Sequence, residues 1–330
     1  MTGHPPNTPE YVRAWGRHTH RSPLYGHLTE VVASDPQLMR VLNRIENQPR
    51  PNLLFAGVQY LLAKGATPEL AAFYASLVPE PLPPGQAGPV FTEFVLAHED
   101  ELAEIGRTRR TQTNECRRCS GLLPMIWHGH HDEFHLVDLG TSAGLNLAVD
   151  RYSYRWDGVA WGSGLVSIEA ESRGRPPKPR DISILSRIGL DLSPIDSRSD
   201  DARDWLVALI WPEQHERRER LTAAIAELSR LEYELIPGDA LETLASTLAG
   251  LPAGEPVVVM NSFVMIQLTP EQRDAVDDLV DAARADRPAL RVSMEILVKE
   301  EVGAHLVVDD GSGPEEIGLA HPHGEWIELL

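Results

Sequence analysis

The stretch His135–Asp150, HLVDLGTSAGLNLAVD, decides the expected fold of this 330-residue chain. Its first five residues are a short apolar run of the kind that forms a buried parallel strand. Gly140 and Gly144 follow, and glycine lets the backbone turn sharply and come close to a ligand. The residues from Thr141 to Ala148 are expected to start a helix. The stretch thus predicts the strand, glycine turn and helix start of a doubly wound α/β domain.

The glycine turn departs from two familiar phosphate-binding patterns. The dinucleotide fingerprint G-x-G-x-x-G is absent because position 142 is serine. No Gly-Lys-Ser/Thr follows, so the turn is not a P-loop either. A glycine turn of this kind is weak evidence taken alone, and its meaning depends on the strands that follow.

Three expected strands end in an acid. Asp138 closes the strand before the glycine turn, Asp191 follows SRIGL, and Asp239 follows the strand that ends at Pro237. In a doubly wound sheet these carboxyl ends meet at one crevice, where an acid can accept both ribose hydroxyls of a nucleoside. The order therefore predicts a site for a small adenosine-type cofactor. The alternative for each acid is a helix N-cap.

The rest of the chain alternates short apolar runs with amphipathic helical patterns, which is typical of a mostly parallel sheet. Further strands are expected at Ser186–Leu192, Glu232–Pro237, Pro256–Met260 and Leu290–Ile296, with a final antiparallel pair at His305–Val308 and Trp326–Leu330. We therefore predict a seven-stranded, mostly parallel Rossmann-like sheet in residues 106–330, with a hairpin insertion near 151–180. Residues 1–105 have helical spacing with proline breaks and are expected to form a helical module.

Composition narrows the class of protein. Asp and Glu total 49 and Lys and Arg total 30, giving a net charge of −19. Such a surface repels phosphate backbones and anionic lipid, so neither nucleic acid nor membrane is an expected partner. No apolar stretch or signal core is long enough for a membrane or secretion signal. The two cysteines cannot form a disulfide framework, which agrees with a reducing compartment, and the chain is expected to be cytoplasmic. Composition says nothing of its oligomeric state.

The order DLGTSAGLN, GLDLSP, GDA and VVVMNS resembles the class I S-adenosylmethionine-dependent methyltransferase superfamily over about residues 135–300. The resemblance implies that Gly140 and Gly144 flank the methionine portion and that Asp191 holds the ribose. Asp239 and Ala240 would lie at the adenine edge. The other residues implied to bind the cofactor are Asp138, Ser142 and Asn146.

One spacing departs from that superfamily. Asp191 lies 47 residues after Gly144, where about 20 is usual for such an acid. We assign the excess to the hairpin insertion. Glu169 and Glu171 lie closer to the turn, and either is a rival for the ribose role.

The whole chain also resembles a narrower group, the domain-of-unknown-function family 2332. The resemblance rests on RTQTNE, GLNL, RYSYRW, DLSPID and LIWPEQ, and it spans most of the sequence. It strengthens the expectation for the fold and implies no activity.

The polar run RTQTNE precedes the first strand within an expected helix over Glu93–Ile126. Gln112, Glu115 and Cys119 have helical spacing and would share one helix face. We interpret the run as a lid over the cofactor, and the alternative is an exposed helix start capped by Thr113. The residues expected to bind the substrate are Arg110, Gln112, Asn114, Arg118 and Ser262.

Two residues are candidates for catalysis. Asn261 ends the fourth strand, which in the superfamily faces the transferred group, and with Ser262 it could orient a nucleophile. The alternative is an ordinary strand-end turn. Glu115 is the candidate general base, although a base is optional for an amine or a phenol.

Cys116 and Cys119, with the histidines of HGHH at 128–131, have some resemblance to metal ligands. We predict no metal, because the cysteines are flanked by helical sequence and HGHH resembles an exposed loop. The leading hypothesis is methyl transfer from S-adenosylmethionine to a small molecule. Alternatives are use of another carbon of that cofactor (cyclisation, lysis or aminocarboxypropyl transfer), ligand binding without catalysis, and nicotinamide-dependent oxidoreduction.

Overall fold

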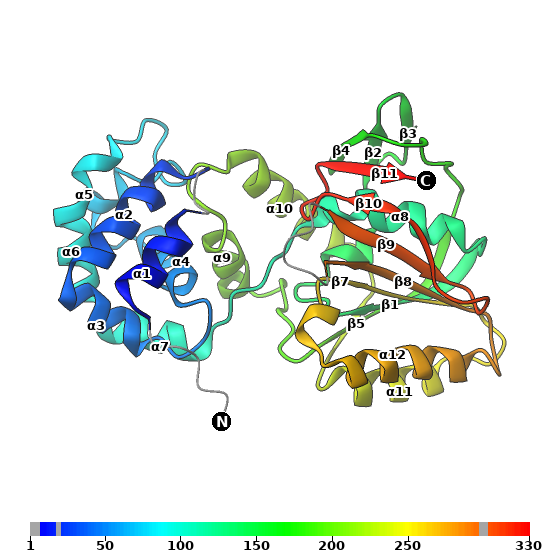
Figure 1. Ribbon diagram of the computed structural model, residues 1–330. Helices are drawn as coiled ribbons and strands as arrows, with labels where there is room; N and C mark the ends of the chain where they lie inside the picture. Colours follow the sequence, from blue (N-terminus) through cyan, green and yellow to red (C-terminus); the bar gives the residue numbers. More distant parts are fainter. Residues whose placement is uncertain (1–6, 18–20, 297–302) are drawn as a thin grey trace. The chain divides into compact units, whose positions relative to one another are not determined.

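The computed structural model describes residues 7–17, 21–296 and 303–330. The chain divides into two compact units. One contains the described residues up to Thr113 together with Ser199–Glu219, and the other contains Asn114–Arg198 and Arg220–Leu330. The first unit is helical, and the second contains the sheet (Figure 1). The helical unit differs from the expected module of residues 1–105 because it takes in a second segment of the chain.

The helical unit is built from eight described α-helices and one short 3₁₀ turn. These are α1 (Pro9–Gly16), α2 (Pro23–Ser34), α3 (Pro36–Arg44), α4 (Arg50–Ala63), α5 (Pro68–Ala71), η1 (Pro84–Gln86), α6 (Gly88–Ala97), α7 (Glu99–Thr108) and α9 (Asp200–Ala208). Helix α10 (His215–Leu228) contains the boundary between the units. None of the helices in the described ranges is long and apolar enough to cross a membrane.

Several helices begin with the same local signal, a capping residue followed by proline. Thr8, Ser22 and Asp35 each accept a backbone N–H of the first turn of α1, α2 and α3. The next residue in each case is proline, whose fixed φ suits the first helical position and whose missing N–H is not needed there. This signal accounts for the helix starts that the proline breaks predicted.

Helix α9 is held to the helical unit by the buried amide of Gln59 on α4. Its Nε2 donates to the carbonyl oxygens of Ala208 at 2.9 Å and Ile210 at 2.7 Å, at the carboxyl end of α9. Ser76 donates to the Oε1 of the same amide at 2.8 Å. A second group of contacts joins Asp201 of α9 to Tyr60, Lys64 and Arg109. These contacts explain why Ser199–Glu219 packs with helices far away in sequence.

The sheet unit contains one sheet of eleven strands in the order β3-β2-β4-β11-β10-β9-β8-β7-β1-β5-β6. The strands are β1 (Glu133–Leu139), β2 (Ser153–Trp156), β3 (Val159–Trp161), β4 (Ser167–Ser172), β5 (Ser183–Asp191), β6 (Glu234–Pro237), β7 (Val257–Ser262), β8 (Ala289–Glu295), β9 (Ala304–Asp309), β10 (Glu315–Ala320) and β11 (Trp326–Leu329). Its helices are α8 (Cys119–His128), α11 (Ala240–Gly250) and α12 (Pro270–Ala283), with 3₁₀ turns η2 (Cys116–Arg118), η3 (Leu145–Ala148) and η4 (Met265–Gln267).

The expected mixed α/β class is confirmed, but the seven-stranded sheet is wrong. Five strands are parallel and neighbour one another as β6-β5-β1-β7-β8. Counted along the chain without the inserted strands, this order is 3-2-1-4-5, the order of a doubly wound sheet. Strands β9, β10 and β11 then continue antiparallel, and β4 pairs parallel to β11. The inserted segment thus extends the sheet to eleven strands.

The expected antiparallel pair at the carboxyl terminus is also wrong, because a strand intervenes. Strand β9 pairs with β10, and β10 pairs with β11. The segment EEIGLA of β10 has no regular alternation of apolar and polar residues, so its sequence gives little strand signal.

The helix expected after the glycine turn is reduced to the single turn η3. The carbonyl oxygens that a longer helix would use are bound by side chains instead. Tyr152 donates to Leu145 at 2.6 Å, and Tyr154 donates to Val149 at 2.5 Å. Because these acceptors are taken, the segment turns directly into β2. The expected helix over Glu93–Ile126 is likewise divided, into α6, α7 and α8 with an irregular segment between α7 and η2.

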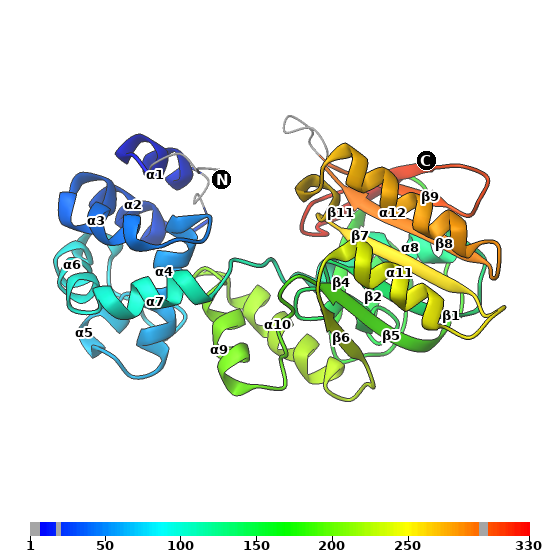
Figure 2. The same cartoon turned by 90° about the horizontal axis from the view of Figure 1, so that it is seen from below.

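Each face of the parallel strands packs against different helices. Figure 2 shows α11 and α12 lying along the sheet. Val137, Leu139, Val257 and Val259 pack on that side with apolar residues of both helices. Helix α8 packs against β8 and β9, and its residue Gly121 approaches Leu306 of β9. Successive residues of a strand alternate between these two faces.

We expect Gln59→Leu to destabilise the helical unit. The substitution leaves two helix-end carbonyl oxygens without a donor, which costs about 1–3 kcal/mol of unfolding free energy. Urea unfolding followed by tryptophan fluorescence measures the change. Gln37→Leu, at an exposed position of α3, is the matched control and should change stability by less than about 0.5 kcal/mol. Equal effects of the two substitutions would contradict this account of α9.

Candidate functional site

The carboxyl ends of β1, β5 and β7 bring three predicted site residues to one face of the sheet. Asp138 on β1 lies opposite Gly189 on β5 and Met260 on β7 in the parallel register. Asp191 and Ser262 each lie two residues further along their strands, so they point to the same face as Asp138. This edge lies at the reversal of strand order between β1 and β7, where doubly wound folds bind ligands.

The glycine turn has three residues in the left-handed region of backbone conformation. The φ angles are +66° at Gly140, +54° at Ser142 and +77° at Gly144. A Cβ added to Gly140 would meet a methyl group of Val264 at 2.0 Å. Glycine is therefore required at position 140, both for its φ angle and for the packing of Val264.

All five backbone N–H groups from Gly140 to Gly144 donate within the protein. The first two donate to the carbonyl oxygen of Leu190, at 2.7 and 3.2 Å, and that of Gly144 donates to Thr141 at 2.9 Å. The N–H of Ser142 donates to Asp191, and that of Ala143 donates to the Oδ1 of Asn114 at 3.0 Å. A turn whose N–H groups are engaged in this way does not cradle a phosphate.

Asp191 connects the glycine turn to the end of β5. Its Oδ2 accepts the N–H of Ser142 at 2.9 Å, and its Oδ1 accepts the N–H of Ser193 at 2.8 Å. Each carboxylate oxygen can accept a further hydrogen bond, because an ionised carboxylate has about four acceptor positions. The carboxylate is half-buried, and Leu192 beside it is 77% exposed.

Asp138 is a buried acid beside the turn. It is 1% exposed, and its Oδ2 accepts the hydroxyl of Thr141 at 2.8 Å. Burial raises the pKa of Asp138 from 3.8 to about 7, against the opposing effect of the Thr141 hydrogen bond. The negative charge of Asp191 adds to the rise. A carboxyl group of this kind is close to half protonated at neutral pH.

Arg118 brings a buried positive charge to the same face. Its Nη1 donates to the hydroxyl of Ser262 at 3.4 Å, and its guanidinium lies 4.2 Å from the ring centre of Phe263. Phe263 has φ of +60°, which a bulky side chain rarely adopts. The amide of Asn146 donates to the same Ser262 hydroxyl at 3.5 Å and accepts from Cys119. Arg118, Asn146 and Ser262 are thus brought together.

The polar run before β1 does not form the expected helix face. Residues 109–115 are not helical, so Gln112, Glu115 and Cys119 do not share a face of one helix. Glu115, rather than Thr113, caps η2 by accepting the N–H of Arg117. Asn114 belongs to the sheet unit and contacts the glycine turn.

Two other residues of the run belong to the helical unit, and Glu115 has partners of its own. Arg110 and Gln112 lie in the helical unit, so their expected contact with a substrate stays a prediction. Glu115 is 5% exposed and forms an ion pair with Arg220 at 3.2 Å. In this pair the Oε1 of Glu115 accepts from the Nε of Arg220.

Asn261 points away from the residues that it was expected to join. It lies opposite Leu139 in the register, on the face covered by α11 and α12. Its Nδ2 donates to Glu295 at 2.5 Å and to Ser293 at 3.2 Å. The pleat explains the difference, because Asn261 and Ser262 are consecutive and must face opposite sides. Glu295, the last residue of β8, was not predicted, and the only sequence signal for it was an acid at the end of an apolar strand.

The remaining acids have local roles. Asp239 is exposed and caps α11 by accepting the N–H of Leu241 at 2.9 Å, which is the alternative that its sequence position left open. Ala240 is the first residue of that helix. Glu169 and Glu171 lie on β4, separated from β1 by five strands, and their side chains are 66% and 58% exposed. They therefore lie far from the carboxyl ends of β1, β5 and β7 in the order of the sheet.

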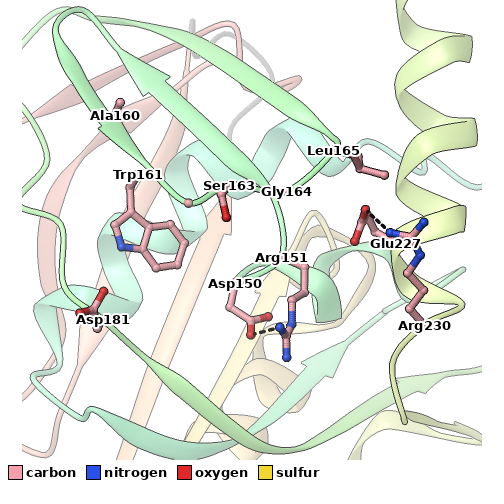
Figure 3. Close-up of a pocket in the computed structure, with 11 residues that line it drawn as sticks. Asp150, Arg151, Ala160, Trp161, Ser163, Gly164, Leu165, Asp181, Glu227 and Arg230 are labelled. Atoms are coloured by element: carbon pink, nitrogen blue, oxygen red, sulfur yellow. Dashed lines mark hydrogen bonds and ion pairs between the residues drawn. The ribbon is translucent and has the colours of Figure 1, made fainter.

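A separate pocket of about 800 Å³ opens beside the β2–β3 hairpin. Figure 3 shows the side chain of Trp161 above that of Asp181 among the residues that line the pocket. It also shows the ion pairs of Asp150 with Arg151 and of Glu227 with Arg230. Asp150 is also bound by the buried Arg187, through two contacts of 2.7 Å. None of the residues predicted for the cofactor or substrate lines this pocket. Cys116 and Cys119 do not line it either, and both are buried cysteines outside any disulfide.

We expect Asp138→Asn to change how stability depends on pH. The folded chain keeps the Asp138 proton to about pH 7 and the unfolded chain releases it near 3.8, so this acid makes stability fall as pH rises between those values. The amide cannot ionise, so the variant should gain stability over the natural protein between pH 4 and pH 8, by up to about 4 kcal/mol. Urea unfolding across that range measures the difference.

Asp196→Asn is the control for this experiment. The pKa of Asp196 is lowered by its hydrogen bond to Arg198, so removing that charge should cost stability at pH 8 instead of adding it. A pH profile for Asp138→Asn that runs parallel to that of the natural protein would show that Asp138 ionises normally.

Comparison with known proteins assigns the chain to a family without naming an activity. No curated protein matches the chain. One family model matches residues 10–329, nearly the whole chain, and thus covers both units. The protein therefore belongs to the family described as uncharacterized protein conserved in bacteria (DUF2332).

Proposed function

We propose that the protein binds S-adenosylmethionine at the carboxyl edge of β1, β5 and β7 and transfers its methyl group to a small molecule. The observation that carries the proposal is the contact of the Asp191 carboxylate with the glycine turn. That contact sets an acid at the end of the second parallel strand, beside the turn that follows the first. This is the position from which an acid accepts the two hydroxyls of a ribose.

The hydrogen bonds of the glycine turn favour a cofactor without phosphate. A dinucleotide needs free backbone N–H groups for its pyrophosphate. Here those N–H groups have acceptors within the protein, and the nearby carboxyl groups of Asp138 and Asp191 would repel phosphate. S-adenosylmethionine carries no phosphate, and its sulfonium, ammonium and ribose groups suit acceptors and negative charge. The same reasoning disfavours nicotinamide-dependent oxidoreduction.

Two further features suit the other ends of this cofactor. Leu192, 77% exposed, follows Asp191 and offers an apolar surface to a flat base beside the ribose. Arg118, with Asn146 and Ser262, offers donors to the carboxylate of the methionine portion. The protein would then align the nucleophile with the methyl group and exclude water, because the sulfonium is already a good electrophile.

A second candidate function is ligand binding without catalysis. The ion pair between Glu115 and Arg220 favours it, because the predicted general base already has an arginine as its partner. Use of another carbon of S-adenosylmethionine starts from the same bound cofactor. Mass spectrometry of S-adenosylmethionine incubated with the protein and bacterial metabolites separates the three, since each leaves a different nucleoside product or none.

We expect Asp191→Asn to weaken binding of S-adenosylhomocysteine about 10- to 100-fold. The substitution keeps the side chain's shape but replaces two acceptor oxygens by one acceptor and one donor, at a cost of about 1–3 kcal/mol. Titration calorimetry with the purified full chain measures the affinity. NAD and NADH serve as the competing ligands.

Glu171→Gln is the matched control on β4 and should leave that affinity unchanged. If Glu171→Gln weakens binding and Asp191→Asn does not, the ribose role belongs to β4. If the natural protein releases no heat with S-adenosylhomocysteine or S-adenosylmethionine, the cofactor proposal is wrong.

A further inference from the structure

A buried acid–amide pair lies at the ends of β7 and β8, on the face opposite Asp138. Asn261 is 0% exposed and Glu295 is 4% exposed. The Oε1 of Glu295 accepts three N–H groups, from the Asn261 amide at 2.5 Å, Val264 at 2.7 Å and Met265 at 3.0 Å. Its Oε2 has no hydrogen-bond partner within the described residues, and neither has the Oδ1 of Asn261.

The two unpartnered oxygens belong to the two planar groups that already share one hydrogen bond. As long as Glu295 is ionised, both oxygens are acceptors, and neither can satisfy the other. A buried acceptor without a donor costs about 1–3 kcal/mol, and more when it is charged. One added proton on the Oε2 of Glu295 removes both deficits, because a protonated carboxyl group donates through its O–H.

We propose that Glu295 is a protonated carboxyl group that donates from Oε2 to the Oδ1 of Asn261, so that acid and amide form a ring of two hydrogen bonds. The amide then donates through Nδ2 and accepts through Oδ1. Its second N–H remains bound to Ser293. The proton comes from solvent water during folding and stays on the carboxyl group at neutral pH. No bond other than the O–H is formed or broken.

The basic groups near Glu295 make their hydrogen bonds with other residues, although the charge of Glu295 also acts on the buried guanidinium of Arg291. On β8 the guanidinium of Arg291 donates to Asp277 of α12 at 3.1 Å and to the carbonyl oxygens of Val259 and Val292. Arg273 of α12 donates to the carbonyl of Met265 at 2.7 Å. On the other side, His305 of β9 lies opposite Glu295 in the register and contacts Glu316 of β10. Burial raises the pKa of Glu295, and hydrogen bonds from the backbone N–H groups of Met265, Val264 and Ile266 and from the Asn261 amide oppose the rise.

The pair makes Glu295 a positioning residue for the candidate site. Its Oε1 binds the N–H groups of Val264 and Met265 and so fixes the turn after β7. Val264 packs directly on Gly140, where an added Cβ would meet it at 2.0 Å. Glu295 thus fixes the position of Val264, and Val264 in turn packs against Gly140 of the glycine turn. This inference does not require the proposed cofactor, and its test uses no ligand.

The test is the difference in infrared absorption between the natural protein and Glu295→Gln at pH 7. We expect loss of one protonated-carboxyl C=O band in the variant. Asp138 contributes a band of its own, which cancels in the difference. The glutamine side chain has a donor in place of the proposed O–H, so the melting temperature of Glu295→Gln should stay within about 2 °C of the natural value.

Asn261→Asp is the companion variant. It removes the N–H donor of the amide and places a second carboxyl group opposite that of Glu295. Its melting temperature at pH 7 should fall by about 5 °C or more. The double variant Asn261→Asp with Glu295→Gln reverses acid and amide and should recover most of that loss. The proposal is overturned if the difference spectrum contains no protonated-carboxyl band, if Glu295→Gln melts as low as Asn261→Asp or fails to fold, or if the double variant shows no recovery.

Discussion

The carboxylate of Asp191 is the contact on which the candidate site depends. It binds one N–H from the glycine turn and one from the end of its own strand, so two loops from neighbouring strands share one acid. The other N–H groups of the turn are taken by Leu190, Thr141 and Asn114. The result is a glycine turn whose backbone N–H groups are used within the protein and which has little capacity for phosphate. Chemistry at this edge must therefore rely on carboxylates, hydroxyls, amides and Arg118.

Each face of the parallel strands has a buried acid whose hydrogen-bond donors are uncharged groups. Asp138 lies on one face with a threonine hydroxyl as donor, and Glu295 lies on the other with an amide and two backbone N–H groups. Neither acid forms a direct ion pair with a basic side chain in the described part of the chain. Burial favours the neutral form in both, because desolvation penalises the charged carboxylate. In a chain of net charge −19, neutral acids also avoid adding repulsion to the core.

The sequence was sufficient to locate the five parallel strands along the chain, because apolar runs, glycines and strand-end acids carry strong local signals. It could not reveal the extension of the sheet, since pairing of β4 with β11 depends on register across distant segments. The missing helix after Gly144 has a similar cause, because Tyr152 and Tyr154 take its carbonyl acceptors only in the folded chain. Most of the site residues were predicted because they lie at or just after the carboxyl ends of expected strands. Asn261 was misplaced because the choice of face depends on a one-residue difference, and Glu295 has no motif.

The division of the helical unit into two chain segments has a consequence for synthesis on the ribosome. The amide of Gln59 binds carbonyl oxygens that lie 149 and 151 residues further along the chain and are therefore synthesised later. At about 5–20 residues per second, that interval is roughly 10–30 s. During it, α4 has been made and α9 has not, so the Nε2 of Gln59 lacks its two acceptors from the end of α9. The nascent helical unit is therefore exposed to chaperones and proteases until the first half of the sheet unit has been made.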